Sequence, residues 1–256
     1  MLPLPYCGTP PNPGELLERF NLDPVLIAAL LVAASGHILG ICADSRRSRY
    51  YAACGWVLAA AAFISPLCAL SVSLFSARIA QHMILLLVAA PLIALGLPER
   101  TRPSATWPLW TASVAFMAAL WVWHMPTPYD ATFTATGVYW AMHVTLFGSS
   151  IVLWNELLHH RAQHTALALT VGLCTSMQMG LLGAVLSLAR RPLFFPHYLT
   201  SQAWGLTPLQ DQQLGGTLMW VPGGVLFLWV AIRSLRRLWN TLEAASPHES
   251  NPARLS

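Results

Sequence analysis

The hydrophobic residues of this chain gather in seven runs, each long enough to form a helix that crosses a membrane. About 20 apolar residues in a helix span the roughly 30 Å of hydrocarbon in a bilayer. The pattern therefore predicts an all-α, polytopic membrane protein, a bundle of seven transmembrane helices. The predicted spans cover residues 24–43, 51–73, 79–97, 107–124, 138–158, 165–188 and 214–233.

The spans divide the chain into three parts. We expect an external N-terminal tail over residues 1–23, the seven-helix membrane domain over 24–238 and a polar cytoplasmic tail over 239–256. The first part has no basic start followed by an apolar run, so we expect no cleavable signal peptide. Asp23 and Pro24 favour the cap and first-turn positions, and they predict the start of the first helix there.

The charged residues indicate how the bundle is oriented. They make up only 9% of the chain, against about 25% in an ordinary soluble domain. All 14 basic residues are arginines, and ten of them fall on one predicted face: Arg46, Arg47, Arg49, Arg100, Arg102, Arg161, Arg233, Arg236, Arg237 and Arg254. The other face holds Arg19, Arg78, Arg190 and Arg191. By the positive-inside rule, the N-terminus is external and the C-terminus cytoplasmic.

Several classes of function are excluded by the same composition. The loops are too short to hold a soluble domain, which excludes a membrane-anchored enzyme with a globular head. The missing charge runs exclude a nucleic-acid partner and leave the lipid bilayer as the surroundings. No nucleophile with a base, pair of catalytic carboxylates or phosphate-binding glycine loop stands out, so we expect no enzymatic activity.

The five cysteines form no CxxC pair, and four of them lie in predicted spans. Cysteine in such a position usually acts as a small apolar residue, so we expect neither a structural disulfide nor a thiolate metal site.

Polar residues in or beside lipid are costly, and here they gather near the external face. Six histidines and methionines lie at the external ends of the third, fourth and fifth spans: His82, Met83, His124, Met125, Met142 and His143. Further polar side chains approach from the same side: Asp130, His197, Asp211, Gln212 and Gln213. One wet external vestibule is expected to hold them.

Imidazole and thioether ligands together suit cuprous copper, whereas calcium or magnesium would need more oxygen ligands. Neighbouring residues on a helix point about 100° apart, so a His-Met dipeptide needs an unwound helix end to bind one ion. Pro126 and Pro128 make such unwinding plausible beside His124.

Other polar residues have simpler readings. Met177 and Met179 flank Gln178 in the sixth span; they read as packing residues, with the floor of a copper path as the alternative. His37 reads as a buried polar contact, and the histidines near Arg161 read as a solvated face.

Proline and glycine predict how the spans pack. Pro66, Pro91 and Pro222 are expected to kink the second, third and seventh spans, freeing carbonyls that neighbours must satisfy. Glycines in the sixth and seventh spans permit close helix approach: Gly180, Gly183, Gly215, Gly216, Gly223 and Gly224.

Three sequence blocks resemble the multi-spanning CtaG family of cytochrome c oxidase assembly proteins. They are SLFSARIAQHMILLLVAAPLIALGLP, WVWHMPTPYDATF and GLTPLQDQQLGGTLMWVPGG. The resemblance covers nearly the whole membrane region, and DQQLGG is its most specific part. It implies a bacterial plasma-membrane protein needed to make an active haem–copper oxidase of the caa(3) type, acting through its copper.

The family's motif residues carry over individually. His82 matches the histidine that opens the third span, and His143 matches the one in the fifth. His124 and Asp130 match a WHxPxxYD block, and the last block supplies Asp211, Gln212, Gly215 and Gly216. Two positions depart from the family. Its members often have a second histidine four residues before the one at His82, where this chain has Arg78, and an extra histidine early in the fifth span, near Tyr139 here. A cationic Arg78 would oppose a cation at His82.

The sequence therefore predicts an oxidase assembly factor that binds or passes Cu(I) through an external site of His82, Met83, His124, Met125 and His143. Asp130, Asp211, Gln212, Met177 and Met179 are possible supporting residues. Its partners would be oxidase subunits and an external copper donor. Three alternatives stay open: a membrane cytochrome with His82 and His143 as axial haem ligands, a copper transporter, and a metal-free scaffold for an oxidase subunit.

Overall fold

A computed structural model describes residues 4–41, 45–98, 106–160 and 164–245, and within these ranges the protein contains helices and no strands. The elements in chain order are η1 (Pro13–Glu18), α1 (Pro24–Ser35), η2 (Gly36–Ile41), α2 (Arg46–Ile64), α3 (Leu67–Ser73), α4 (Phe75–Met83), η3 (Ile84–Ala89), α5 (Ala90–Gly96), α6 (Trp107–Trp123), α7 (Pro126–Thr134), α8 (Thr136–Leu158), α9 (Thr165–Leu188), η5 (Phe195–His197), η6 (Ser201–Trp204) and α10 (Pro208–Ala245).

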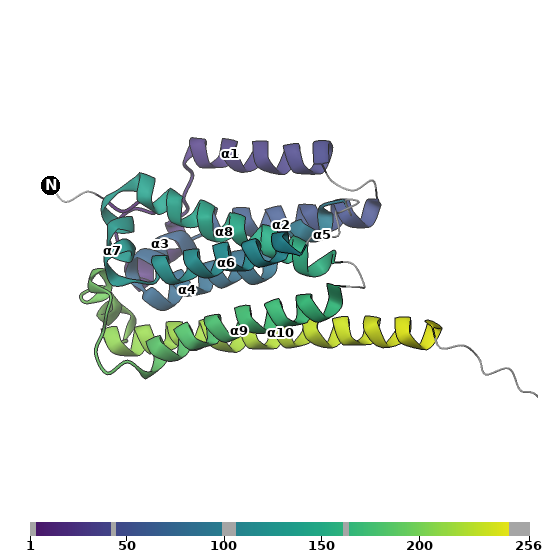
Figure 1. The fold of residues 1–256 in the computed structure, drawn as a ribbon. Coiled ribbons are helices and arrows are strands. Elements are labelled where there is room, and N and C mark those ends of the chain that lie inside the picture. Colours follow the sequence, from purple (N-terminus) through teal and green to yellow (C-terminus); the bar gives the residue numbers. More distant parts are fainter. Residues whose placement is uncertain (1–3, 42–44, 99–105, 161–163, 246–256) are drawn as a thin grey trace, which may run out of the picture.

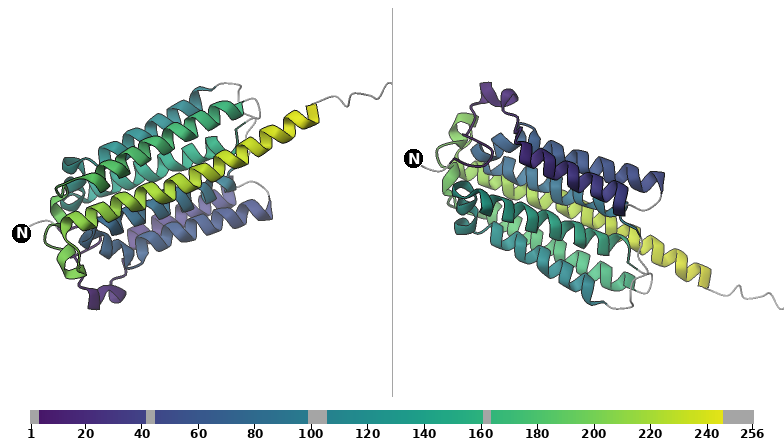
Figure 2. Two further views of the ribbon diagram at one scale, coloured as in Figure 1. Left: turned by 90° about the horizontal axis from the view of Figure 1, so that it is seen from below. Right: turned by 90° about the horizontal axis from the view of Figure 1, so that it is seen from above.

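The long helices lie side by side in one bundle (Figure 1). Helix α1 lies along one flank and packs lightly on α2, whereas α10 packs along α9 and α4 on the other flank. The short helices α7, η5 and η6 close one end of the bundle, which we call the α7 end. The last turns of α10 project beyond the opposite end (Figure 2).

The helices agree closely with the predicted spans, but fewer of them qualify by length. In the described residues, five helices are long and apolar enough to cross a membrane, or six if the bent pair α2 and α3 forms one span. Helix α6 is apolar but has only 17 residues. The expected count of seven spans is therefore not reached by length and composition.

The first helix begins as predicted. The Asp23 carboxylate accepts a hydrogen bond from the backbone N–H of Val25, and Pro24 occupies the first turn. This cap satisfies one of the amide groups that a helix start leaves without an intrahelical partner.

Pro66 breaks the second span as expected, because α2 ends at Ile64 and α3 continues after a bend of 48°.

Pro91 acts differently, since the chain before it widens into the π-helix η3. Proline lacks the N–H that a π-helix would offer to the Leu86 carbonyl. That carbonyl instead accepts from Ser150 Oγ at 2.9 Å and Trp154 Nε1 at 2.7 Å, both on α8. Helix α8 thus satisfies the freed group. Pro222 lies inside α10, which continues through it without a break.

The glycines of α9 and α10 permit the close approach that their spacing predicted. A Cβ added at Gly216 would lie 2.7 Å from the Gly183 carbonyl oxygen, and one at Gly183 would lie 2.9 Å from the Gly216 carbonyl oxygen. A Cβ at Gly215 would lie 2.5 Å from the Phe75 ring of α4. The two helices therefore touch through backbone, and α10 also fits closely against α4. Gly224 has no such neighbour.

The expectation of no disulfide is wrong, because Cys7 and Cys68 are joined by one. Their sequence separation is 61 residues, and no short-range cysteine pattern marks the pair. The error arose because Cys68 was treated as an isolated residue in a lipid-embedded span. The bend at Pro66 places it on α3 near the α7 end, where the N-terminal segment reaches it.

Helix α10 runs on to Ala245, into the segment predicted to be a polar tail from residue 239. The part of this helix that is apolar enough to cross a membrane ends at Arg236, before that segment. Trp239 Nε1 donates to Glu243 one turn later, which shows helical geometry within that segment. Residues 246–256 lie outside the described residues.

Candidate histidine site

Three histidines from three helices meet inside the bundle, near the α7 end. His82 comes from α4, His124 from the C-terminal cap of α6 and His143 from α8. The His82 ring lies 5.9 Å from the His124 ring and 5.3 Å from the His143 ring, centroid to centroid. All three are buried. The sequence prediction that brought these residues together therefore agrees with the structure.

Hydrogen bonds orient two of these rings. His124 Nδ1 lies 2.7 Å from the Leu120 carbonyl oxygen, and His143 Nδ1 lies 3.0 Å from the Tyr139 carbonyl oxygen. Because a carbonyl only accepts, each Nδ1 carries the proton and each Nε2 keeps its lone pair. A backbone bond of this kind is the usual support for a histidine that ligates a metal through its other nitrogen.

The remaining ring nitrogens are buried and have no hydrogen-bond partner. They are Nε2 of His124, Nε2 of His143 and both nitrogens of His82. An unsatisfied buried polar atom costs free energy, so this group of nitrogens, which includes the unprotonated Nε2 of His124 and of His143, is costly as it stands. The rings do not yet converge on one point, however. In the described residues, no group of three or more His, Cys, Asp or Glu side chains is placed to hold a metal ion.

The methionines of the predicted site lie in different surroundings. Met83 and Met142 are buried in the core beside the histidine-bearing segments, whereas Met125 is 49% exposed in the turn before α7. Met83 is thus better placed than Met125 to lie beside the three imidazoles. The second sulfur of the predicted set faces outward.

The expected wet vestibule is absent from the described structure. His197, Asp211 and Gln212 are fully buried, as are the three histidines. The carboxylate of Asp211 and the side-chain amide of Gln212 are satisfied by other protein groups. The α7 segment and the η5 and η6 turns cover this end of the bundle, which the sequence had suggested was open (Figure 1).

Asp211 and Gln212 hold helices together instead of facing a ligand. The Asp211 carboxylate accepts from the backbone N–H groups of Phe75 and Ser76 and from the Ser76 hydroxyl, so it caps α4 from α10. Gln212 accepts from the Leu193 N–H and donates to the Leu186 carbonyl, so it links α10 to the end of α9. The DQQLGG block is therefore a packing motif between α4, α9 and α10.

Arg78 lies one helical turn before His82 and is buried, with 1% of its surface exposed. Its guanidinium donates to Thr132 Oγ1 at 2.6 Å. Its Cζ lies 4.1 Å from the ring centroid of Phe133, 5.2 Å from that of Tyr129 and 5.9 Å from that of Tyr139. Aromatic faces attract a cation through their quadrupole, which partly compensates for the lost hydration.

His197 joins this region from the turn after α9. Its Nε2 lies 2.6 Å from the Tyr129 hydroxyl. Burial, with a smaller contribution from the Arg78 charge, lowers the pKa of His197 to about 3, so the ring is neutral. Burial also raises the pKa of Tyr129 above its ordinary value and raises that of Asp130. One oxygen of Asp130 is buried and has no hydrogen-bond partner.

The N-terminal segment packs against the histidine group through Tyr139. The Tyr6 ring stacks on the Tyr139 ring at 4.8 Å, and Cys7 Sγ lies 3.4 Å from the Tyr139 hydroxyl. Tyr139 in turn lies 4.3 Å from the His143 ring. Tyr6 donates to Asp23, and burial, followed by this hydrogen bond, raises the pKa of Tyr6. The disulfide therefore fixes a cover over one side of the site.

Met177 and Met179 point to different sides of α9. Met177 is 62% exposed, whereas Met179 is buried against Gly223 of α10. The two sulfurs therefore do not share one path. His37 makes the predicted buried contact, accepting a hydrogen bond from Trp56 Nε1 at 3.1 Å.

The geometry bears on the haem alternative. Two axial imidazoles bind on opposite faces of a macrocycle, which must fit between them. His82 and His143 instead meet edge to face, with an interplanar angle of 72°. One ring edge thus occupies the place where a macrocycle would have to lie.

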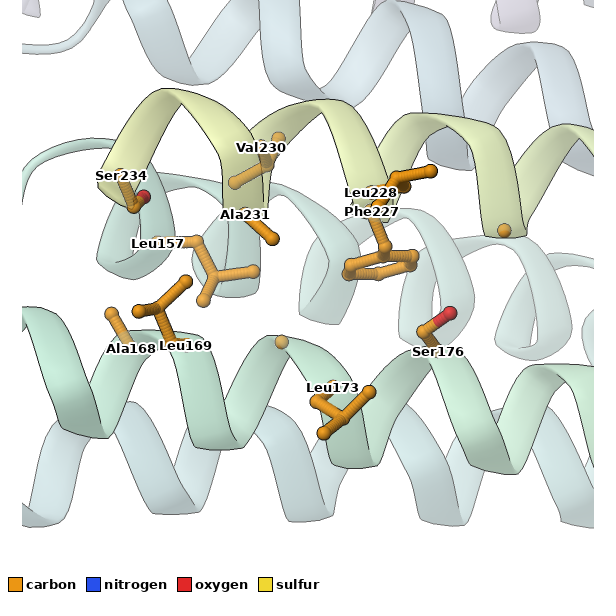
Figure 3. A pocket seen from close by; sticks show the side chains of 12 residues that line it. Leu157, Ala168, Leu169, Leu173, Ser176, Phe227, Leu228, Val230, Ala231 and Ser234 are labelled. Carbon is orange, nitrogen blue, oxygen red and sulfur yellow. The ribbon is translucent and has the colours of Figure 1, made fainter. Parts of the chain in front are cut away.

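Cavities lie between the outer helices of the bundle. One of about 390 Å³ lies between α1 and α8, has mainly apolar walls, and reaches His143. Another, of about 260 Å³, lies between α8, α9 and α10 in the opposite half of the bundle. Figure 3 shows its side chains, which are apolar except for Ser176 and Ser234. Of these two cavities, the first offers an approach to the histidines.

Sequence reasoning missed the aromatic surroundings of Arg78 and the contact of the N-terminal segment with Tyr139. Tyr129, Thr132 and Phe133 follow the spacing of one helical face, which was a detectable signal. Tyr139 lies four residues before His143, also one turn away. Nothing local marked Cys7 as a partner of Cys68.

Comparison with known proteins yields one match. The family described as cytochrome c oxidase caa3 assembly factor (Caa3_CtaG) matches residues 42–241, which is most of the chain and begins after α1. No curated protein and no solved structure matches the chain.

Proposed function

Because the chain belongs to the family of cytochrome c oxidase caa3 assembly factors, we propose that it holds cuprous copper at His82, His124 and His143 and passes it to the nascent oxidase. One observation carries this proposal. Three helices bring together imidazoles whose free ring nitrogens are buried without a partner. Such a group is costly unless something binds to it.

Neutral imidazole and thioether are the side chains that suit soft Cu(I). His124 and His143 already present an unprotonated Nε2, so a cuprous ion would displace no proton from either ring. Met83 follows His82 on α4 and is buried, but it would reach the same ion only if the helix opened there. A small movement of the rings would bring them onto one ion, and His124 occupies the C-terminal cap of α6 instead of a helix interior.

The copper site belongs to a protein that spans a bacterial plasma membrane seven times. Helix α6 brings the number of crossings from six to seven, because its 17 residues lie at the short end of the range for a spanning helix. The excess of arginines on the opposite face supports an external α7 end by the positive-inside rule. The Cys7–Cys68 disulfide lies at the same end and fits an oxidising compartment.

Copper then moves from an external donor to an oxidase subunit on the outer side of the membrane. The cavity between α1 and α8 gives an approach to His143 from the lipid-facing side. This route suits a partner that is itself a membrane protein.

The test compares purified full-length protein with a variant in which His82, His124 and His143 are all replaced by glutamine. His37→Gln is the control, because His37 is also a buried histidine but lies far along the bundle beside Trp56. After anaerobic loading with Cu(I), we expect bound copper in the wild type and the control and none in the triple variant. Cells with the triple variant should make oxidase that lacks copper. Normal oxidase copper in those cells would leave a metal-free scaffold as the function.

A further inference from the structure

Arg78 carries a buried positive charge that no carboxylate neutralises. In the part of the chain that the structure describes, no acidic side chain lies within ion-pair distance of its guanidinium. Its single hydrogen-bond acceptor is the neutral Thr132 hydroxyl, and its other contacts are aromatic faces. Its Nε has no partner.

This charge lies beside the histidine group. Arg78 and His82 are one turn apart on α4, and both are buried. On the other side, the Tyr139 ring lies between the guanidinium and His143. The Tyr139 ring is in contact with the His143 ring. The positive charge of Arg78 also acts on a neighbouring side chain, because it contributes to the low pKa of His197.

The fully buried acid of this region is occupied elsewhere. The Asp211 carboxylate accepts from Phe75 and Ser76 at the start of α4. A cation bound by the three neutral imidazoles would therefore add a second positive charge to a region where, among the described residues, no carboxylate is paired with Arg78.

We propose that Arg78 determines how readily copper leaves the site, because its fixed charge weakens the binding of a cuprous ion at His82, His124 and His143. The inference rests on the proposed function. A protein that passes copper on needs a site that releases it, and repulsion inside a partly dry bundle lowers affinity without removing a ligand. Arg78 acts through this repulsion and is a tuning residue, not a ligand.

The first experiment varies the charge at position 78. The affinity of the purified full-length protein for Cu(I) is measured by competition with a chromophoric cuprous chelator under anaerobic conditions. Arg78→Gln keeps a hydrogen-bond donor for Thr132 but removes the charge, and we expect it to lower the Kd by about tenfold or more. Arg78→Lys keeps the charge and should bind copper about as weakly as the wild type.

The second experiment leaves Arg78 in place. Thr132→Asp puts a carboxylate where the guanidinium already donates a hydrogen bond, and Thr132→Asn is its uncharged match in shape. We expect Thr132→Asp to tighten copper binding and Thr132→Asn to leave it nearly unchanged. A purely structural role for Arg78 would not separate these two variants. These two Thr132 variants also test whether the charge of Arg78 weakens copper binding if Arg78→Gln does not fold.

The outcomes separate the two proposals. If the wild type binds copper and neither Arg78→Gln nor Thr132→Asp binds it more tightly, the role of Arg78 is overturned and the histidine site stands. If none of the five proteins binds copper, both proposals are overturned. Copper bound by Arg78→Gln and Thr132→Asp but not by the wild type would overturn the proposed copper binding of the natural chain, while supporting the repulsion exerted by Arg78.

Discussion

The Asp211 carboxylate of α10 accepts a hydrogen bond of 2.7 Å from the backbone N–H of Phe75, the first residue of α4. Residues 136 positions apart are thereby joined at a helix start, where unpaired amide groups and the helix dipole favour a negative charge. This contact sets the position of α4, which carries both Arg78 and His82.

Replacing Asp211 should therefore act first on the stability of the helix bundle, and not directly on copper binding. Asp211→Ala removes an acceptor from three donors, two of them backbone groups. We expect a loss of about 2–3 kcal/mol, measured by denaturation in detergent micelles, because hydrogen bonds to charged groups are among the stronger ones. Asp211→Asn keeps one acceptor and should lose less. Equal stability of Asp211→Ala and wild type would contradict the capping role.

A second prediction concerns the carbonyl that Pro91 leaves free. Ser150→Ala or Trp154→Phe alone leaves the Leu86 oxygen with one donor, whereas the double variant leaves it with none. An unsatisfied buried carbonyl costs about 1–3 kcal/mol. We expect the double variant to lose more stability than the sum of the two single losses, as neighbouring sites often do. Strict additivity in a thermal melt would argue against a shared role.

The sequence predicted what depends on local pattern. Helix bounds follow from hydrophobic runs, the cap at Asp23 follows from residue type, and the meeting of His82, His124 and His143 follows from equal depth on different spans. These features need little knowledge of how the spans pack.

The features that were missed depend on packing between distant segments. Cys7 finds Cys68 only because the chain bends at Pro66, and Arg78 is buried only because α7 folds over it. Asp211 was expected near the metal because it lies at the same depth as the histidines, yet it turns to the start of α4. The sequence pattern indicates how deep a residue lies in the membrane, but it does not show which neighbouring helix its side chain faces.

The disulfide gives a prediction about sidedness. In a background where Cys42, Cys54 and Cys174 are alanine, intact cells should show no labelling by a membrane-impermeant maleimide. Pretreatment with a membrane-impermeant reductant should make Cys7 reactive, since this residue is partly exposed and the N-terminus is proposed to be outside. Labelling only after the membrane is opened would reverse the proposed orientation.

The same disulfide is expected to support stability. It closes a loop across a sequence separation of 61 residues, and such crosslinks typically contribute about 2–4 kcal/mol. Replacing both Cys7 and Cys68 by serine should lower the melting temperature in micelles. It should also release Tyr6 from Tyr139, which would be detected as faster proteolysis of the N-terminal segment. Replacing the free Cys174, which is exposed, is the control and should change neither.

His197 predicts how stability varies with pH. Its pKa is about 3 in the folded protein, against 6.5 for an ordinary histidine, so below pH 6.5 the unfolded chain takes up a proton that the folded chain refuses. Its contribution to stability is therefore complete above pH 6.5 and is lost progressively as the pH falls towards 3. Between pH 7 and pH 5 the loss of stability from this residue is about 2 kcal/mol, at roughly 1.4 kcal/mol for each pH unit below 6.5.

The His197→Gln variant does not titrate and can keep a hydrogen bond to Tyr129. The difference in melting temperature between wild type and His197→Gln should therefore shift in favour of the variant on going from pH 7 to pH 5. A difference that stays constant over this range would mean that His197 accepts a proton as readily in the folded protein as in the unfolded one, and that burial does not keep the ring neutral.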